Sequence, residues 1–478
     1  MTQMRRGWFH LASGAGVGRI FGFLSNLLLS RWLGPTDLGL FNLVTTTVQT
    51  SDTLVRCGGD YALNFELGGN PESPETDGGV QLSRALAQIC SLMTLVICVG
   101  VAIWVFWGQG LFPFSMETSQ RLMLCGLLIV MIACEGSSAS AWEVLLVNHR
   151  TASLALRQGL FYPLRLFFAA CGALFAGVLG AMLGWTLIAV VQVLWLKTVL
   201  KTFWNPLKIF PLLRSSMSQL LRRGLPFYAA NLLASMIFYP LLVKVATGSG
   251  LEEVGYLRVG QILQQLFAFL PATLVPVLFL RLRGESNFAD QVLVIEKPLR
   301  VIWLLLLEVL FLYCILDHSL IRWFFGADYT SALTPTRVLL VTALFECLNQ
   351  LAVQPLLAAG KIRLYGLCQN GSVILSAFIG WFWIPSAGLA AYLLVRLLYV
   401  IVPLAIFSVP VFKKLREPQK ILWLLVASIV LLALILVQLF NGYQPNWMPF
   451  VFLIFLSSTA VFQRHDLALL RQALRKTT

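Results

Sequence analysis

Charged residues are scarce in this sequence. Lys, Arg, Asp and Glu make up 12% of its 478 residues, whereas an ordinary soluble domain carries about twice that share. Hydrophobic residues account for 58%, and the mean hydropathy is +0.81. This leaves too little polar surface to cover a water-facing globule. We therefore exclude a soluble enzyme, a nucleic-acid-binding protein and a secreted disulfide scaffold, and interpret the chain as a polytopic membrane protein.

Catalytic, nucleotide-binding and metal-binding motifs are also missing. The four histidines are scattered, and no HExxH, GxSxG, DxD or GxxxxGK[ST] pattern occurs. The nine cysteines lie mostly inside apolar runs without a CxxC pair, which is typical of buried small hydrophobic side chains. The sequence thus predicts no metal site, no cofactor and no ATP hydrolysis by this chain.

Fourteen apolar stretches could each cross a bilayer, which takes about 20 residues per helix. The first follows Arg5 and Arg6 but runs on too long for a signal peptide, so we expect an uncleaved helix. Lys and Arg in the short loops divide 26 to 4 between the two sides, which predicts that both termini are cytoplasmic. The stretches begin near Trp8, Leu40, Leu86, Leu122, Ser153, Gly180, Leu225, Gly255, Arg300, Leu333, Tyr365, Gly388, Ile421 and Trp447.

An internal repeat indicates two halves. The segment Asp37–Gln49 aligns with Glu253–Gln265 at an offset of 216 residues, and Gly180–Gly184 weakly matches Gly388–Tyr392. The larger offset spans six helices, so both copies keep one orientation, which predicts an all-α fold of two pseudo-symmetric six-helix bundles plus two C-terminal helices. We expect bundles at 1–200 and 225–412, a basic cytoplasmic linker at 201–224, and at 413–478 two further helices with a basic cytoplasmic tail.

Polar side chains recur deep within the expected spans. A charge in hydrocarbon costs several kcal/mol, so each such side chain should face a cavity or a partner. Three arginines, Arg19, Arg165 and Arg396, lie near the middle of their spans. Other polar residues recur at helical spacing and so line one face of a helix. Either a water-filled passage or polar contacts between helices would explain these faces, and their recurrence in both halves favours the passage. They include Asn26, Asn42, Gln49, Tyr228, Asn231, Arg258, Gln261 and Gln265.

Two acids are candidates for ion coupling. Glu346 lies on a polar face with Asn349 and Gln350, where it could load a proton or a sodium ion or pair permanently with an arginine. Asp52 is the second candidate, although Arg56, four residues later, could neutralise it.

Four stretches, in order along the chain, resemble a known family. Leu27–Phe41 is similar to the junction between the first two helices of bacterial polysaccharide-transport proteins, the Wzx-type lipid-linked oligosaccharide flippases. Phe325–Ala332, Leu356–Tyr365 and Ile384–Ala391 resemble further stretches of that family. The resemblance covers essentially the whole chain and implies membership of the multidrug/oligosaccharidyl-lipid/polysaccharide exporter superfamily.

The resemblance implies a flippase and not an enzyme. Such proteins move an undecaprenyl-diphosphate-linked oligosaccharide from the cytoplasmic to the periplasmic leaflet of the bacterial inner membrane, by alternating access through a cationic cavity. Arg19 matches the family's first-helix arginine, whereas Leu280 stands where relatives often carry proline. The implied partners are the lipid bilayer, a polysaccharide polymerase and a chain-length regulator, and no nucleic acid.

The chemistry of such a substrate suggests which residues would bind it. A diphosphate without cations is prohibitively costly to desolvate, and arginine offers a fixed fork that matches phosphate oxygens. We expect Arg19 and Arg258, with Arg165 or Arg396, to bind the diphosphate. The cavity lining and sugar contacts would come from Asn26, Asn42, Gln49, Tyr228, Asn231, Gln261 and Gln265.

Three other functions stay open. A cation-coupled drug exporter of the same superfamily would depend on acids such as Glu346. A polytopic glycan polymerase or ligase would be expected to carry a long extracytoplasmic catalytic loop, which the sequence lacks. A non-transporting scaffold for glycan-assembly enzymes would have no need of deep arginines.

Overall fold

The structure is a computed structural model in which regular structure is helical throughout the described residues. It describes residues 2–67, 77–107, 118–147, 151–200, 213–267, 287–359 and 362–416, together with short stretches between 274 and 285 and between 418 and 435. No strand occurs among them, and the all-α fold predicted from the sequence is confirmed.

The long helices are apolar runs of the kind that cross a bilayer. In chain order the elements are α1 (Thr2–Arg56), α2 (Gly59–Leu67), α3 (Asp77–Trp107), α4 (Thr118–Val147), α5 (Thr151–Leu156), the π-helical turn η2 (Arg157–Phe161), α6 (Tyr162–Leu200), α7 (Arg214–Ser249), α8 (Leu251–Phe267), α10 (Phe288–Phe324), the 3₁₀ turn η3 (Ala327–Ala332), α11 (Leu333–Ala352), α12 (Gln354–Ala358) and α13 (Ile362–Phe412). In the described chain, seven helical segments are long and apolar enough to span a membrane.

Three of the long helices contain two expected spans each. A 55-residue helix such as α1 would measure about 80 Å if unbroken, more than twice the thickness of a bilayer core. Each is interrupted at a glycine with positive φ: Gly34 in α1, Gly177 in α6 and Gly388 in α13. Positive φ is costly for residues with a Cβ atom, so glycine allows the break. The count of fourteen spans stays a prediction, since the stretch beginning at Trp447 lies outside the described residues.

The breaks recur at equivalent positions of the internal repeat. Gly34 (φ 70°, ψ 173°) and Gly250 (φ 102°, ψ 164°) share one conformation and are 216 residues apart, as in the sequence alignment. Gly388 (φ 52°, ψ −129°) has the conformation of Gly177 (φ 55°, ψ −137°). The backbone therefore pairs Gly388 with Gly177, and the sequence alignment of Gly388 with Gly180 was wrong by three residues. The backbone angles show which glycines of the two halves correspond, because the stretch of similar sequence is too short to align them reliably.

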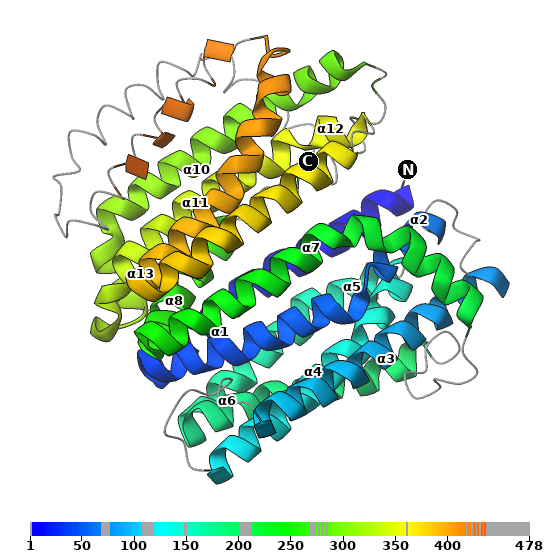
Figure 1. The fold of residues 1–478 in the computed structure, drawn as a ribbon, viewed down its shortest axis with the longest axis vertical. Helices are drawn as coiled ribbons and strands as arrows, with labels where there is room; N and C mark the ends of the chain where they lie inside the picture. Colours follow the sequence, from blue (N-terminus) through cyan, green and yellow to red (C-terminus); the bar gives the residue numbers. More distant parts are fainter. Residues whose placement is uncertain are drawn as a thin grey trace. The chain divides into compact units, whose positions relative to one another are not determined.

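The described chain forms two compact units. The first comprises Met1–Arg258 with Val373–Tyr392, and the second Val259–Ser372 with Leu393–Thr478. In the first unit α1 packs against α6 and α7, and α3 packs against α4 (Figure 1). In the second unit α10 packs against α11 and α12. The bundle boundaries expected from the sequence, with a linker at 201–224, stay a prediction.

The outward faces of the helices are strongly apolar. Phe175 is 89% exposed, Leu367 74% and Phe382 68%. Apolar side chains of this size rarely face water in large numbers. They are suited to lipid, in agreement with a multi-pass membrane protein.

The two repeat-related junctions meet within the first unit. A Cβ atom on Gly39 of α1 would clash with the carbonyl oxygen of Leu251, and one on Gly255 of α8 with that of Pro35. Pro35 and Leu251 are themselves 216 residues apart, as are Gly39 and Gly255. Thr36 Oγ1 also donates to Glu252 Oε1, 216 residues away, at 3.3 Å. The start of α8 thus packs on the break in α1 with local two-fold symmetry.

Substituting Gly39 by alanine should destabilise this junction. Overpacking of a close contact costs about 1–3 kcal/mol, so we expect Gly39→Ala to lower the melting temperature of the purified protein by several degrees. In the control, Gly100→Ala, the new methyl group has no neighbour within 4 Å, and we expect unchanged or slightly higher stability. Equal melting temperatures for Gly39→Ala and wild type would contradict the packing described here.

Candidate functional site

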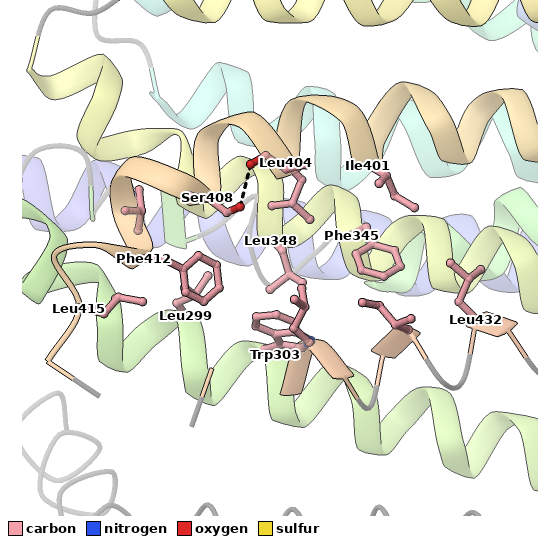
Figure 2. Close-up of a pocket in the computed structure, with 15 residues that line it drawn as sticks. Leu299, Trp303, Phe345, Leu348, Ile401, Leu404, Ser408, Phe412, Leu415 and Leu432 are labelled. Atoms are coloured by element: carbon pink, nitrogen blue, oxygen red, sulfur yellow. Dashed lines mark hydrogen bonds between the residues drawn. The ribbon is translucent and has the colours of Figure 1, made fainter. Parts of the chain in front are cut away.

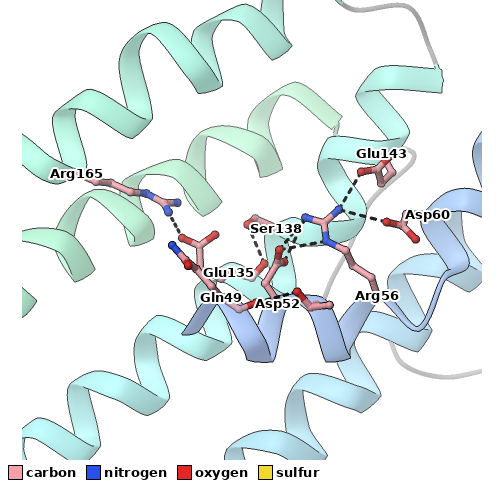
Figure 3. A network of polar contacts seen from close by, with 9 residues as sticks. Gln49, Asp52, Arg56, Asp60, Glu135, Ser138, Glu143 and Arg165 are labelled. Carbon is pink, nitrogen blue, oxygen red and sulfur yellow. Dashed lines mark hydrogen bonds and ion pairs between the residues drawn. The ribbon is translucent and has the colours of Figure 1, made fainter. Parts of the chain in front are cut away.

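Arg56, at the end of α1, is neutralised by three carboxylates. Its guanidinium nitrogens lie 3.1 Å from Asp52 Oδ2, 2.9 Å from Glu143 Oε1 of α4 and 3.9 Å from Asp60 Oδ2 of α2 (Figure 3). The guanidinium of half-buried Arg157 lies 4.8 Å from the centre of the Trp142 ring, within electrostatic range of Asp52 and Glu143. Asp52, a predicted ion-coupling residue, therefore belongs to an ion network that joins α1, α2 and α4.

Arg165 of α6 also has an acidic partner. It forms an ion pair with Glu135 of α4 (Figure 3). It also donates a hydrogen bond to Gln192, on the second half of α6. Its guanidinium lies 6.0 Å from the centre of the Trp185 ring. Arg165 was expected among the substrate-binding arginines, but its charge is compensated inside the first unit, which favours a structural role.

In the second unit, Arg337 of α11 forms a buried ion pair with Asp317 of α10. Sequence reasoning did not single out this pair, because the two residues lie on different helices and no local spacing joins them. It is a third deep arginine that is already neutralised.

Arg258 of α8 is buried without an acidic partner. It is 5% exposed, and its Nη2 donates to Asn26 Oδ1 of α1 at 3.3 Å. Its Nε is buried and has no hydrogen-bond partner, and no carboxylate of the described residues lies within 4.0 Å of it. The neutral amide of Asn26, which also donates to the carbonyl of Gly22 at 2.8 Å, cannot compensate a full positive charge.

Tyr162 of α6 lies near both Arg258 and Arg19. Its phenol is within electrostatic range of both guanidinium groups. Its ring would lie 3.5 Å from a Cβ atom at Gly22, one turn after the half-buried Arg19 on α1. The structure therefore brings together Arg19, Asn26, Tyr162 and Arg258, hereafter the Arg258 cluster. Sequence reasoning missed Tyr162, although its position three residues before Arg165 places both on one helix face.

The other predicted lining residues divide by exposure. Asn42 is fully buried and donates to the carbonyl of Val254 at 3.5 Å, and Tyr228 is 2% exposed. Asn42 thus makes a polar contact with a neighbouring helix, which is the alternative explanation of the polar faces, whereas the buried hydroxyl of Tyr228 has no hydrogen-bond partner. The side chains of Gln49 and Gln265 are exposed and that of Gln261 is half-buried. The side chain of Asn231, like Leu280, lies outside the part of the chain described.

The second unit has its own polar cluster. Glu346 Oε2 of α11 accepts a hydrogen bond from Gln264 Nε2 of α8 at 3.3 Å. Tyr399 of α13 interacts electrostatically with Glu346 and with Arg396, and it accepts a hydrogen bond from Gln369. We call Gln264, Glu346, Gln369, Arg396 and Tyr399 the Glu346 cluster. No carboxylate in the described ranges lies within 4.0 Å of Arg396.

The deep arginines therefore fall into two groups. Arg56, Arg165 and Arg337 each pair with a carboxylate, whereas Arg258 and Arg396 pair with none that the structure describes. An uncompensated cation inside a membrane is costly, and it is a common mark of a site for an anion. Arg258 in the first unit and Arg396 in the second are the strongest anion-binding candidates. No group of His, Cys, Asp and Glu suited to a metal ion occurs in the described segments.

An apolar pocket of about 270 Å³ lies in the second unit (Figure 2). Its walls come from α10, α11, α13 and a short stretch at 425–432, and Ser408 is its one polar side chain. The indole of Trp303 is held in the wall by a 2.9 Å hydrogen bond from its Nε1 to Ser428 Oγ. A pocket so lined suits part of a hydrocarbon chain. The larger side chains around it are Leu299, Trp303, Phe345, Leu348, Leu404 and Phe412.

Comparison with known families identifies the class of protein. The family described as polysaccharide biosynthesis protein matches residues 4–280, and the chain belongs to this family. The family resemblance inferred from the sequence is confirmed. No curated protein sequence matches the chain significantly.

Solved structures of membrane transporters share the fold. The chain is similar to the lipid II flippase MurJ in an inward closed conformation, with 12% identity over 97% of this chain and 99% of that one, at a TM-score of 0.69. It is also similar to an inward-facing multidrug resistance MATE family transporter of the MOP superfamily, with 16% identity, 84% and 96% coverage and a TM-score of 0.64. A third is a MOP superfamily transporter from Pyrococcus furiosus, with 15% identity, 86% and 96% coverage and a TM-score of 0.57. The fold is thus that of a MOP superfamily transporter.

The Arg165–Glu135 pair gives a test of which arginines are structural. Arg165→Gln leaves Glu135 uncompensated in the membrane, which should cost about 3–5 kcal/mol of stability. The double variant Arg165→Gln/Glu135→Gln should recover most of the loss, as measured by thermal unfolding of the purified protein. A stable Arg165→Gln protein that has lost transport would instead give Arg165 a direct role with substrate.

Proposed function

We propose that this protein flips an undecaprenyl-diphosphate-linked oligosaccharide from the cytoplasmic to the periplasmic leaflet of the bacterial inner membrane. Membership of the polysaccharide biosynthesis family supports a glycan substrate. The similarity to a lipid II flippase supports a lipid-linked form. The observation that carries the proposal is Arg258, a buried guanidinium with a neutral amide partner and an unused Nε donor.

Arg258 is suited to a diphosphate. A phosphate brought into the membrane must exchange its hydration for fixed donors, and the planar fork of arginine offers two parallel N–H donors that stay charged. Exchange of the Asn26 contact for a phosphate oxygen would replace a neutral acceptor by an anionic one, so that the guanidinium gains a counter-charge as well as a hydrogen bond. Arg19, which like Arg258 is within electrostatic range of Tyr162, would bind the second phosphate group.

Arg396, in the second unit, is a further arginine that could bind an anion in this proposal, whereas Arg165 is not. Glu135 already neutralises Arg165, so binding of an anion there would require breaking a buried ion pair. In this proposal the exposed Gln49 and Gln265 and the half-buried Gln261 would contact sugar hydroxyls. Asn42 and Tyr228 would reach a sugar only after the helices around them separate.

The apolar pocket of the second unit would hold part of the isoprenoid chain. Its wall consists almost entirely of hydrocarbon and aromatic surface. A polyisoprenoid segment could therefore bind there without leaving a polar group of the wall without a hydrogen-bond partner. In this proposal, alternating access moves the charged headgroup while the lipid tail stays in an apolar environment. Both termini would be cytoplasmic, and a polymerase and a chain-length regulator would act on the flipped product.

A second candidate function is cation-coupled export of small amphiphiles. The fold shared with multidrug MATE transporters and the unpaired carboxylate of Glu346 favour it. The two functions differ in phenotype, because a drug exporter changes sensitivity to toxic compounds and leaves surface polysaccharide intact.

Removal of the Arg258 charge should strongly reduce flipping without unfolding the protein. In a strain that lacks the chromosomal gene, Arg258→Ala should lose about 2 kcal/mol or more of substrate binding, roughly a 30-fold loss of transport. Arg258→Lys, which keeps the positive charge but loses the two parallel N–H donors, should retain part of the transport activity. The measurements are surface polysaccharide and the lipid-linked saccharide that accumulates on the cytoplasmic face.

The control is Arg322→Ala, which removes an exposed arginine from the end of α10. It should leave surface polysaccharide unchanged at an equal level of membrane-inserted protein. Full polysaccharide in both Arg258→Ala and Arg19→Ala strains would reject the proposal.

A further inference from the structure

A π-helical turn sets the direction of the Tyr162 side chain. The turn η2 (Arg157–Phe161) precedes α6, which begins at Tyr162. Pro163 has no N–H group, and its ring would clash with the carbonyl of Gly159, four residues earlier, which disfavours a regular α-helical turn. The backbone N–H of Tyr162 donates to the carbonyl of Arg157, five residues back. Such a turn rotates the side chains that follow it around the helix axis, and π-helical turns are frequent at functional sites.

The ring of Tyr162 faces α1. Its Cε1 would lie 3.5 Å and its Cδ1 3.7 Å from a Cβ atom at Gly22, so the glycine leaves room for the ring. Gly22 lies on the same face of α1 as Arg19, three residues before it, and Asn26, four residues after it. Asn26 in turn accepts the 3.3 Å hydrogen bond from Arg258. The ring is therefore held within one helical turn of Arg19 and of the amide that contacts Arg258.

The described structure gives the hydroxyl of Tyr162 no partner. It forms no hydrogen bond with a described residue, and it is not among the polar atoms that are enclosed without one. Tyr239, by contrast, shares a 2.8 Å hydrogen bond with Thr47 Oγ1, and the hydroxyl of Tyr399 accepts one from Gln369. Packing of the ring on α1 requires only a phenyl group, so the hydroxyl is available to a ligand.

A neutral donor suits this position. The phenol is within electrostatic range of the guanidinium groups of Arg19 and Arg258, so α1, α6 and α8 each direct one donor toward the same region. Arg258 already has no described carboxylate within 4.0 Å. A further guanidinium at position 162 would add a second charge to be stabilised while the site is empty, whereas a phenol adds a donor without a charge.

We propose that Tyr162 is a substrate-binding residue of the Arg258 cluster, and that its hydroxyl donates a hydrogen bond to a phosphate oxygen of the lipid-linked substrate. Tyrosine hydroxyls bind phosphate oxygens in other proteins, and an O–H donor forms a short, strong hydrogen bond with an anionic oxygen. The two arginines supply the positive charge, and the tyrosine, fixed by its packing against Gly22, orients the phosphate. The ligand in this assignment comes from the proposed function.

Binding of farnesyl diphosphate to the purified full chain in detergent tests the assignment. This probe carries a diphosphate and an isoprenoid chain but no sugar, so a change in its affinity cannot come from a sugar contact. Tyr162→Phe removes one hydroxyl and keeps the ring. Its affinity, measured by thermal unfolding over a titration of the probe, should fall about tenfold, because a hydrogen bond to a charged group is lost. The melting temperature without the probe should stay that of the wild type.

Tyr313→Phe is the matched control. It makes the same chemical change on α10, where the hydroxyl of Tyr313 is buried without a hydrogen-bond partner, and it should keep wild-type affinity. Tyr162→His returns an N–H donor on a ring and should recover part of the affinity, which a role in packing alone does not predict. Tyr162→Leu replaces the phenylalanine variant if that variant does not fold, and it should bind the probe at least as weakly.

Two results would overturn the assignment. One is a wild type that does not bind farnesyl diphosphate. The other is wild-type affinity in Tyr162→Phe beside lost binding in Arg258→Ala, and it would leave the proposed function standing. Binding that depends on Tyr162, in a protein that fails to flip lipid-linked saccharide, would reject the proposed function and keep Tyr162 as a diphosphate ligand.

Discussion

The cost of placing charge in hydrocarbon determines which polar residues of this protein have a structural role and which are available for function. Arg56, Arg165 and Arg337 meet that cost with carboxylates from neighbouring helices, and these pairs join α1 to α4, α4 to α6, and α10 to α11. Once those pairs are set aside, Arg258 and Arg396 remain uncompensated by any described carboxylate. The same constraint leaves Glu346 as an uncompensated acid. The internal ion pairs thus separate helix-joining residues from candidate binding residues.

The internal repeat explains how Arg258 reaches its position. The breaks at Gly34 and Gly250 share one backbone conformation, and the glycines five residues later allow α1 and α8 to approach closely. In the repeat alignment Arg258 occupies the position of Asn42, so one copy carries a guanidinium where the other carries an amide. The two copies of the repeat therefore differ by one positive charge at equivalent positions. This difference gives the junction one cation, which suits the binding of one anionic headgroup.

The second unit contains an acid and an arginine that carry opposite charges and do not form an ion pair. Glu346 and Arg396 both interact with Tyr399 but do not pair with each other. Arg396 is therefore a candidate for binding a phosphate, and an apolar pocket in the same unit offers surface for a lipid chain.

The sequence by itself determined the membrane class, the all-α fold, the family and the 216-residue repeat, because these depend on composition, local periodicity and short motifs. It also indicated Arg258 and Glu346, since polar residues are rare in apolar spans. It could not assign partners: Glu135 lies 30 residues from Arg165, and Tyr162 reaches Arg258 only through helix packing. Only the tertiary structure decided which arginines are neutralised, and it moved the second repeat match from Gly180 to Gly177. The reason is that ion pairing depends on distances between helices, which no periodicity within one helix encodes.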